Sequence, residues 1–438
     1  MIYNLGKWVK PTKEEYKMVI NREKKDRVRV GWIGVGRRGF GMIQQALKMD
    51  DIDILWVADL DAQKLEKVAT LCTENGNPVP KFTADYHDVL ADRAVDAVIV
   101  MTEWYSHGKI AIEAIKAGKY TGVEVGCVHD LDECFKLVDA YEEYKTPVMM
   151  LENCCYGRKE MAALRMAREG LFGELVHADG AYGHYLNEVE LFGNVPEGKF
   201  DEKHYRQYEY QNRNAENYPT HALGPISKIL RINRGNRALR LSSFASKSRG
   251  LEDFVSRHLP ADYPLQGKKF NQGDVVTTVI TCANGETIRL TLDTTIPRPY
   301  YTRSFSIRGT RGCCIEEGCG SVTFFLEGMK EGVINNKAEF YEKYDHPLHK
   351  INTEDKGGHA DNIDWHVLRA FFEAVKAGTN TPIDAYDTAT WMAIGPLSEE
   401  SIAKGGMPVS IPDFTKGAWF HRDPVVKSIY CLDEVFEG

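Results

Sequence analysis

The chain has 438 residues, of which 43% are hydrophobic and 27% are charged, and its formal net charge is −8. The length favours two domains, and the composition is typical of a soluble globular protein and excludes a disordered or fibrous one. The negative charge argues against general nucleic-acid binding. No apolar run is long enough to span a membrane, and residues 1–26 lack the apolar core of a secretory signal. We therefore expect a cytoplasmic protein with no nucleic-acid or membrane partner.

The ten cysteines include two adjacent pairs, Cys154-Cys155 and Cys313-Cys314, but no CxxC pair. Adjacent cysteines suit neither a zinc site nor an easily formed disulfide. We expect reduced, buried thiols, as is usual in a cytoplasm.

The first motif is a glycine-rich turn between an apolar run, residues 28–33, and a helical pattern; we interpret residues 1–27 before it as an N-terminal arm. Gly34 allows a tight turn, Gly36 allows the backbone to approach a pyrophosphate, and Gly39 allows close packing of helix on strand. Arg37 and Arg38 complete the turn, and the first N–H groups of the helix face the phosphates. The motif predicts a dinucleotide site, although a glycine turn without a ligand is the simpler alternative.

Asp59 gives the motif its context, because it ends a second apolar run, residues 51–58. A carboxylate about 20 residues past the glycines accepts a hydrogen bond from a ribose 2′-OH. The same carboxylate repels a 2′-phosphate, so we expect NAD rather than NADP.

From residue 28 to 152 apolar strands alternate with amphipathic helices, which predicts an α/β domain with a parallel, doubly wound sheet. Further strands are expected at 95–101, 120–125 and 147–151. Ligands of such sheets bind beyond the carboxyl ends of the strands. Thr102, Trp104, His107, Glu124, Glu152 and Asn153 lie at or just beyond those ends.

The second domain, residues 153–438, shows period-two alternation at 275–283 and 286–293, joined by Asn284-Gly285, the strongest short hairpin signal. Residues 174–186, 304–308 and 313–316 also look extended. Helices are expected at 158–169, 220–232, 363–377 and 384–404, the last kinked by Pro396, with a polar segment at 187–217. These patterns predict a mostly antiparallel, open sheet whose free face forms a homo-oligomer interface, in a dimer or tetramer.

Four clusters in the second half are rich in tyrosine and histidine; they contain Tyr182 and His184, Tyr218 and His221, Tyr300, and His359. Tyr182 and His184 are two residues apart, so both point to one face of a strand. His221 lies near a helix N-terminus, which favours a neutral imidazole. A tyrosine acts as a base only if a nearby cation lowers its pKa from about 10. Any one of these residues alone is more often structural than catalytic.

His184, His221, His359 and Asp361 could in principle supply ligands to a metal ion. No HxxxH or HExxH spacing supports such a site, and the acids are few, so we expect no required metal.

At these residues the chain resembles a known group. The N-terminal half is similar to the Gfo/Idh/MocA oxidoreductase superfamily, in which a Rossmann domain precedes an open-sheet α/β domain. Its dehydrogenases carry a Glu-Lys-Pro tripeptide after the fifth strand, where this chain has Glu124-Val125-Gly126. The missing lysine argues against ordinary sugar dehydrogenation.

The more specific resemblance is to glycoside hydrolase family 109, the NAD-dependent α-N-acetylgalactosaminidase group. The motifs that carry it are Thr102-Glu-Trp104, Leu151-Glu-Asn-Cys-Cys-Tyr156, Tyr182-Gly-His184, Asn217-Tyr-Pro-Thr-His221, Pro297-Arg-Pro-Tyr300 and Gly357-Gly-His359. The chain departs from the family at Tyr185, Ala222, Ala360 and Asp361, which surround the expected sugar.

The resemblance implies roles for individual residues. Catalysis is assigned to Tyr182, His184, His221, Tyr300 and His359, and contact with the glycoside or amino-sugar substrate to Tyr218, Glu124 and Tyr185. Cofactor binding is assigned to Gly34, Gly36, Arg37, Arg38, Gly39, Asp59, Thr102, Trp104, His107, Glu124 and Asn153.

It also implies a route without net redox change, in which the sugar is transiently oxidised at C3, loses its leaving group by elimination, adds water and is reduced again. Family 109 is an exception to the two-carboxylate pattern of glycosidases. NAD would then stay tightly bound and be recycled in each turnover. Two alternatives stay open: an NAD-dependent sugar dehydrogenase with net redox change, and a non-catalytic NAD-binding scaffold.

Overall fold

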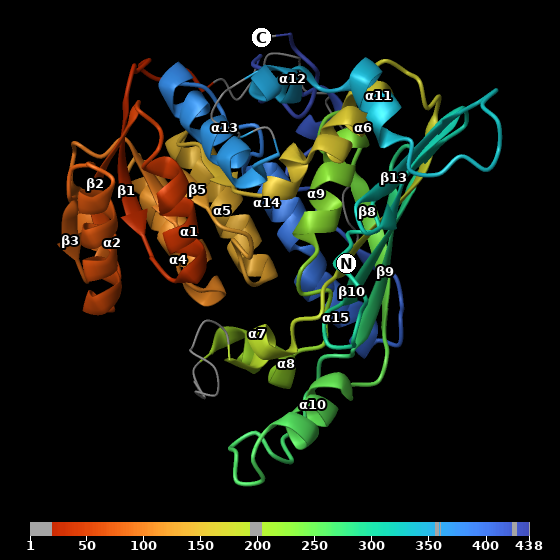
Figure 1. Ribbon diagram of the computed structural model, residues 1–438, viewed down its shortest axis with the longest axis horizontal. Helices are drawn as coiled ribbons and strands as arrows, with labels where there is room; N and C mark the ends of the chain where they lie inside the picture. Colours follow the sequence, from red (N-terminus) through yellow and green to blue (C-terminus); the bar gives the residue numbers. More distant parts are fainter. Residues whose placement is uncertain (1–19, 193–203, 355–358, 360, 423–426, 438) are drawn as a thin grey trace, which may run out of the picture.

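The computed structural model describes residues 20–192, 204–354, 359, 361–422 and 427–437. Figure 1 shows two sheets on opposite sides of the molecule, with helices α9 (Thr220–Ile229), α13 (Ile363–Ala377) and α14 (Ala385–Met392) between them. Most of the predicted N-terminal arm lies outside the described residues.

The first sheet has six strands in the order β3-β2-β1-β4-β5-β6, and every neighbouring pair is parallel. This order is that of a dinucleotide-binding Rossmann fold, so the predicted class of the first domain is confirmed. β4 and β5 are buried along their whole length, as expected for strands covered on both faces. The strands are β1 (Val28–Ile33), β2 (Ile52–Ala58), β3 (Lys81–Thr83), β4 (Ala97–Val100), β5 (Tyr120–Val123) and β6 (Val148–Met150); the helices between them are α1 (Arg37–Ala46), α2 (Ala62–Glu74), α3 (Tyr86–Ala91), α4 (Trp104–Lys116) and α5 (Leu131–Tyr144).

The second sheet has eight strands in the order β13-β12-β11-β7-β10-β9-β8-β14. Neighbours are antiparallel except β7 and β10, which run parallel. The predicted hairpin is confirmed, because β9 and β10 pair across Asn284-Gly285 and Gly285 has a φ of +101°. The strands are β7 (Leu175–Gly183), β8 (Ala238–Ala245), β9 (Val275–Cys282), β10 (Thr287–Asp293), β11 (Ser306–Gly309), β12 (Gly312–Gly318), β13 (Ser321–Leu326) and β14 (Val409–Ser410).

Among the described residues, helices cover one face of the second sheet. α9 packs on β7, and α15 (Ile394–Ala403) packs on β8. Burial alternates along β9 and β10, and the apolar side chains of Val176, Phe244 and Val279 are exposed. The predicted open, mostly antiparallel sheet is therefore confirmed.

The segment predicted only as polar, 187–217, contains two helices, α7 (Asn187–Phe192) and α8 (Tyr205–Asn212). They share a small apolar core with α10 (Gly250–His258), which projects from the body of the molecule in Figure 1. That core includes Phe192, Tyr210 and Phe254. It joins α7, α8 and α10 into one packed unit.

The predicted single kinked helix at 384–404 is corrected to two helices, α14 and α15, with Ala393 between them. Pro396 has no N–H to donate to the carbonyl of Met392, and its ring clashes with that carbonyl. The first helix therefore ends at Met392. The remaining elements are η1 (Asn153–Tyr156), α6 (Arg158–Arg168), α11 (Lys337–Tyr344), α12 (Pro347–Glu354) and η2 (Ala418–Phe420).

Helices from the second half of the chain complete the first domain. α13 packs on α1, and α14 packs on α5 and β6. Arg369 and Lys376 of α13 form ion pairs with Asp51 at 2.6 and 2.7 Å. The two halves of the chain therefore share one core. Within the described residues no helix combines the length and apolar character needed to cross a membrane.

Candidate active site

A cavity of about 350 Å³ lies at the carboxyl edge of the first sheet. One wall comes from the glycine turn and the ends of β4 and β5, and the other from α7, α8 and the segment before α9. Residues predicted from the sequence to bind cofactor or substrate line it: Arg37, Arg38, Thr102, Trp104, His107, Glu124 and Tyr218. Val189, His204, Tyr205 and Arg206 face them and were not predicted.

The glycine turn has the geometry of a phosphate cradle. Gly34 has a φ of +93°, and a Cβ on Gly39 would lie 2.4 Å from the carbonyl oxygen of Gly34. A Cβ on Gly36 would meet no atom within 4 Å, so open space lies above the backbone there. The turn therefore requires glycine at two positions for its own packing and leaves the third free for a ligand. These features fit NAD.

Asp59 supports this turn. Its Oδ2 accepts a hydrogen bond from the Val35 N–H at 2.8 Å, and its Oδ1 accepts one from the Asp61 N–H at 3.0 Å. A carboxylate has about four acceptor sites, so capacity remains for a ribose hydroxyl.

Arg38 connects the glycine turn to both halves of the chain. It donates to Glu124 at 2.8 Å and, through both terminal nitrogens, to Asp364 of α13 at 2.7 and 2.8 Å. Asn153 also donates to Asp364, at 2.6 Å. Burial raises the pKa of Asp364, but its bonds to Arg38 outweigh burial and lower the pKa overall. Asp364 was not predicted, because it lies 211 residues beyond Asn153 with no motif around it.

The tripeptide that replaces Glu-Lys-Pro differs in backbone as well as side chains. Gly126 has a φ of +77°, which proline cannot adopt. A Cβ at this position would lie 2.3 Å from the Trp104 ring. The Oε1 of Glu124 accepts a hydrogen bond from the Val125 N–H at 3.0 Å, so the carboxylate is held at the cavity edge.

His107 lines the cavity, but its ring nitrogens are 3.1 and 3.2 Å from the carbonyl oxygens of Thr102 and Gly126. Burial lowers the pKa of His107. The side chain therefore holds together the loops after β4 and β5, and its assignment to the cofactor stays a prediction.

Beside the cavity lies a group of aromatic and histidine rings. Tyr182 and Tyr218 stack with centroids 4.3 Å apart, and His221 lies 5.5 Å from Tyr182 and 4.9 Å from Tyr218. His184 lies 5.9 Å from Tyr182, so the two predicted neighbours do come together. Tyr301, which belongs to the predicted cluster of Tyr300 but was given no role, packs 4.9 Å from His184. We call these five residues the ring group.

Arg206 of α8 brings a positive charge to the ring group. Its guanidinium lies 4.6 Å from the Trp104 ring centroid and 5.4 Å from that of Tyr218. The side chain is only 14% exposed and pairs with the fully buried Glu190 at 3.3 Å. Burial raises the pKa of Tyr182, and the charge of Arg206 opposes that rise. The only sequence signal for Arg206 was its position among tyrosines in the polar segment.

His221 corrects the prediction of a neutral imidazole. Its Nδ1 lies 2.8 and 2.9 Å from the two carboxylate oxygens of the fully buried Glu152. Burial alone would lower the pKa of His221, but Cys154 and Glu152 outweigh it and raise the pKa to about 10. Cys154 and Glu152 therefore outweigh burial, and the imidazolium is the favoured form.

Three predicted residues are not brought into the ring group. Tyr300 lies near Gly318 and is 38% exposed. Tyr185 is 39% exposed and accepts a hydrogen bond from the side chain of Asn187. His359 stacks on Trp365, with centroids 3.8 Å apart, while Gly357, Gly358 and Ala360 lie outside the described residues. The roles of Tyr300, Tyr185 and His359 stay predictions.

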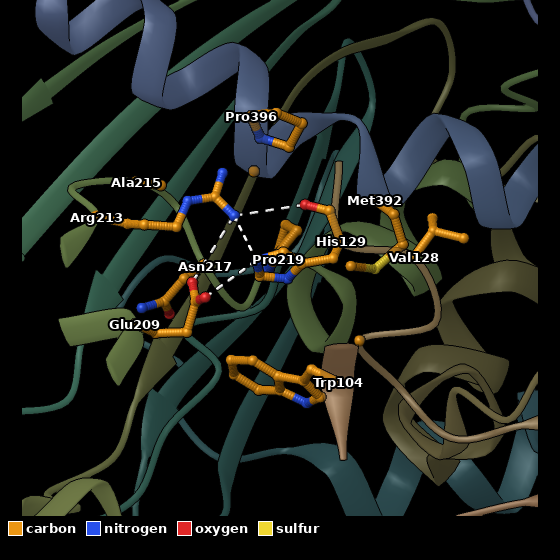
Figure 2. Close-up of a pocket in the computed structure, with 12 residues that line it drawn as sticks. Trp104, Val128, His129, Glu209, Arg213, Ala215, Asn217, Pro219, Met392 and Pro396 are labelled. Carbon is orange, nitrogen blue, oxygen red and sulfur yellow. Dashed lines mark hydrogen bonds and ion pairs between the residues drawn. The ribbon is translucent and has the colours of Figure 1, made fainter. Parts of the chain in front are cut away.

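A second, smaller cavity of about 30 Å³ lies on another side of Trp104 (Figure 2). His129, Glu209 and Arg213 form its polar wall: the His129 Nε2 lies 3.0 Å from Glu209 and 2.9 Å from Arg213. Arg213 also pairs with Glu399 of α15 at 2.6 Å. This cluster joins the loop after β5 to α8 and α15, and thereby fixes α8 over the larger cavity.

Comparison with known proteins covers both domains. Residues 28–152 match the family model described as oxidoreductase family, NAD-binding Rossmann fold, and residues 156–421 match glycosyl hydrolase 109, C-terminal domain. An alpha-N-acetylgalactosaminidase from Tannerella forsythia is 38% identical over 416 residues, which cover 91% of this chain and 88% of that protein. A glycosyl hydrolase family 109 protein from Stenotrophomonas maltophilia is 37% identical over 420 residues, which cover 91% of each.

Solved structures agree on the fold. An NAD binding oxidoreductase from Klebsiella pneumoniae has a TM-score of 0.66 at 16% identity and covers 89% of this chain and 100% of its own. Levoglucosan dehydrogenase in complex with NADH and L-sorbose has a TM-score of 0.64 at 17% identity, with the same coverage.

Proposed function

Because the chain belongs to glycosyl hydrolase family 109, we propose that it is an NAD-dependent glycosidase acting on N-acetylgalactosaminides, as the name of its Tannerella relative suggests. The observation that carries the proposal is the contact between the cavity and the ring group. Tyr218 lines the cavity and stacks on Tyr182, so a sugar bound against Tyr218 would meet a tyrosine and two histidines.

The proposed cofactor site is the cavity with its glycine turn. Gly34, Gly36 and Gly39 would hold the pyrophosphate, Asp59 the adenosine ribose, and Arg37, Arg38, Thr102, Trp104, His107, Glu124 and Asn153 the rest of the molecule. When bound, NAD⁺ supplies a reversible acceptor for the hydride on sugar C3.

Within this proposal the protein's own residues handle protons. Oxidation at C3 makes the C2 hydrogen acidic, and Tyr182, with His184 beside it, removes that proton as the leaving group departs. Arg206 favours the phenolate form of Tyr182. His221, held by Glu152, would take the C3 hydroxyl proton from its neutral form as the hydride leaves and return it at the end of the cycle. Tyr218 and Tyr300 would hold the sugar, and His359 would give a proton to the leaving group. No pair of carboxylates flanking the glycosidic bond is required.

The test is turnover of a nitrophenyl N-acetylgalactosaminide in D₂O with no added NAD. Release of nitrophenol, deuterium at C2 of the product and no accumulation of NADH are expected. NADH formed in proportion to product would support a dehydrogenase instead, and absence of turnover across a broad glycoside panel would support a scaffold.

We propose further that NAD is retained through purification, that the open face of the second sheet joins copies of the chain into a dimer or tetramer, and that the protein works in the cytoplasm. Ten unpaired cysteines are in keeping with a reducing compartment. Extraction of the purified protein should release close to one NAD per chain, and light scattering should give more than one chain per particle. An NAD-free monomer would contradict the first two proposals.

A further inference from the structure

Three potential metal ligands converge next to the ring group. Glu152 follows β6, Cys154 lies in η1, and His221 is the second residue of α9. Each offers one ligand atom, and these atoms all lie within 4.8 Å of one another. Of the four metal ligands that the sequence offered as an alternative, only His221 belongs to this group, and Cys154 was expected to be a reduced, buried thiol.

We propose that Glu152, Cys154 and His221 form a site for a thiophilic divalent metal ion such as Zn²⁺. A carboxylate oxygen, a thiolate sulfur and an imidazole nitrogen are all common zinc ligands, and three protein ligands leave a fourth tetrahedral position for water. Carboxylate and thiolate together balance the charge of the ion. The thiolate selects Zn²⁺ over Mg²⁺, which prefers oxygen ligands.

The surroundings orient each ligand. The Oε1 of Glu152 accepts a hydrogen bond from the Cys154 N–H at 2.9 Å, which fixes the carboxylate beside the thiol. Arg303 donates to the Cys154 sulfur at 3.3 Å and also pairs with Glu160. Such second contacts to ligand atoms strengthen metal sites. Glu152 and Cys154 are buried, whereas 15% of the His221 side chain is exposed, so an ion reaches the site from the histidine side.

The site overlaps the catalytic machinery of the proposed function. A metal ion would displace the Nδ1 proton of His221 and the proton of the Cys154 thiol into solvent, and would take the Nδ1 and the carboxylate of Glu152, which otherwise bind each other. Zn²⁺ should therefore stop glycoside turnover. This consequence rests on the proposed function, but metal binding itself does not.

The test uses the full-length protein and Co²⁺ as a spectroscopic substitute for Zn²⁺. We expect one Co²⁺ per chain with a thiolate-to-cobalt charge-transfer band, displaced by Zn²⁺ and unaffected by Mg²⁺. Cys154→Val should abolish the band and weaken Zn²⁺ binding about 100-fold, while the control Cys319→Ser, at an exposed cysteine, should retain both. No thiolate band in the wild type, or an equal band in Cys154→Val, would overturn the site.

Turnover provides a second measurement. Zn²⁺ should reduce wild-type activity by at least tenfold, and a chelator should restore it; the ratio of activities with and without Zn²⁺ should approach one in Cys154→Val. Stoichiometric binding without inhibition would overturn the proposed overlap. If the wild type has no glycosidase activity, the cobalt spectrum still decides the metal site, so failure of the function and failure of the site are distinguishable.

Discussion

In the proposed mechanism, Arg206 is the side chain that most favours proton transfer by Tyr182, because its charge lowers the pKa that burial raises. Burial raises the pKa of Tyr182, so the neutral phenol, which cannot take a proton from carbon, is favoured over the phenolate. A guanidinium stacked on Trp104 and Tyr218 is the compensating charge that the chain itself supplies. The ion pair with Glu190 and the contacts with the aromatic rings offset the cost of burying the Arg206 guanidinium.

Tyr182→Phe should therefore lower turnover by about 10²–10⁴-fold, the usual value of a positioned base, because only the hydroxyl is lost. Deuterium exchange at C2 should fall in parallel, while the NAD content stays the same. Near-normal turnover in this variant would remove Tyr182 from the mechanism.

Arg206→Met should reduce turnover by about 100-fold and also destabilise the fold by roughly 3–5 kcal/mol, since Glu190 is left buried without a counter-charge and with only the Tyr210 hydroxyl as donor. The double variant Arg206→Met/Glu190→Gln removes that orphaned charge. Its thermal midpoint should recover while its turnover does not. Recovery of both in the double variant would show that Arg206 acts only through stability.

At the scale of elements, the glycine turn contains one glycine that the fold requires, Gly39, and one that only a bound ligand would require, Gly36. Gly39→Ala places a Cβ 2.4 Å from the carbonyl oxygen of Gly34 and should lower both stability and NAD content.

Gly36→Ala meets no protein atom within 4 Å, and Gly36 has a negative φ of −60°, so the fold should persist. NAD affinity should still drop by at least about tenfold, or 1.4 kcal/mol. Unchanged NAD affinity in Gly36→Ala would exclude pyrophosphate binding over this glycine.

Most of the first domain was predictable because its signals are local. Parallel strands buried on both faces are continuous apolar runs, and the glycine turn marks the start of the first strand–helix–strand connection. In the second domain the Asn284-Gly285 hairpin was equally local, but the parallel pairing of β7 with β10 joins segments more than a hundred residues apart and leaves no trace in either strand.

The candidate site divides in the same way. Tyr182 and Tyr218 belong to motifs and do come together, whereas Arg206 and Asp364 arrive on helices that carry no motif. The predicted neutral form of His221 was wrong, because the protonation of this side chain depends on Glu152, which is 69 residues earlier in the chain. Charge interactions across such separations follow from the fold and not from sequence spacing.

At the scale of the whole molecule, elements from both ends of the chain hold the two sheets as one body. α13 pairs with Asp51 of the first domain, and Arg213 links α8 to α15. Glu216 lies within this shared interior at 1% exposure, and its Oε2 has no hydrogen-bond partner among the described residues. Burial raises the pKa of Glu216 from its ordinary 4.5 to about 8.

A raised carboxyl pKa means that the folded state binds a proton that the unfolded state has lost between pH 4.5 and 8. The stabilisation from Glu216 is therefore complete below pH 4.5 and is lost as the pH rises to 8, by about 5 kcal/mol in total. Glu216→Gln should flatten the fall in thermal midpoint between pH 5 and 8. Glu66→Gln, at an exposed glutamate, is the matched control and should leave the fall unchanged; equal profiles for the two variants would contradict a protonated Glu216.

Gly126 limits which substitutions the segment 124–126 can accept. Restoring the superfamily's Glu-Lys-Pro requires more than Val125→Lys, because the backbone at Gly126 has a φ of +77° and any Cβ there meets Trp104 at 2.3 Å. Trp104 lines both cavities, and the Arg206 guanidinium lies over its ring. Conversion to a lysine-dependent dehydrogenase therefore needs coordinated replacements at Val125, Gly126 and Trp104. A substitution at Gly126 alone places its Cβ against the Trp104 ring, so it should be destabilising unless Trp104 is replaced with it.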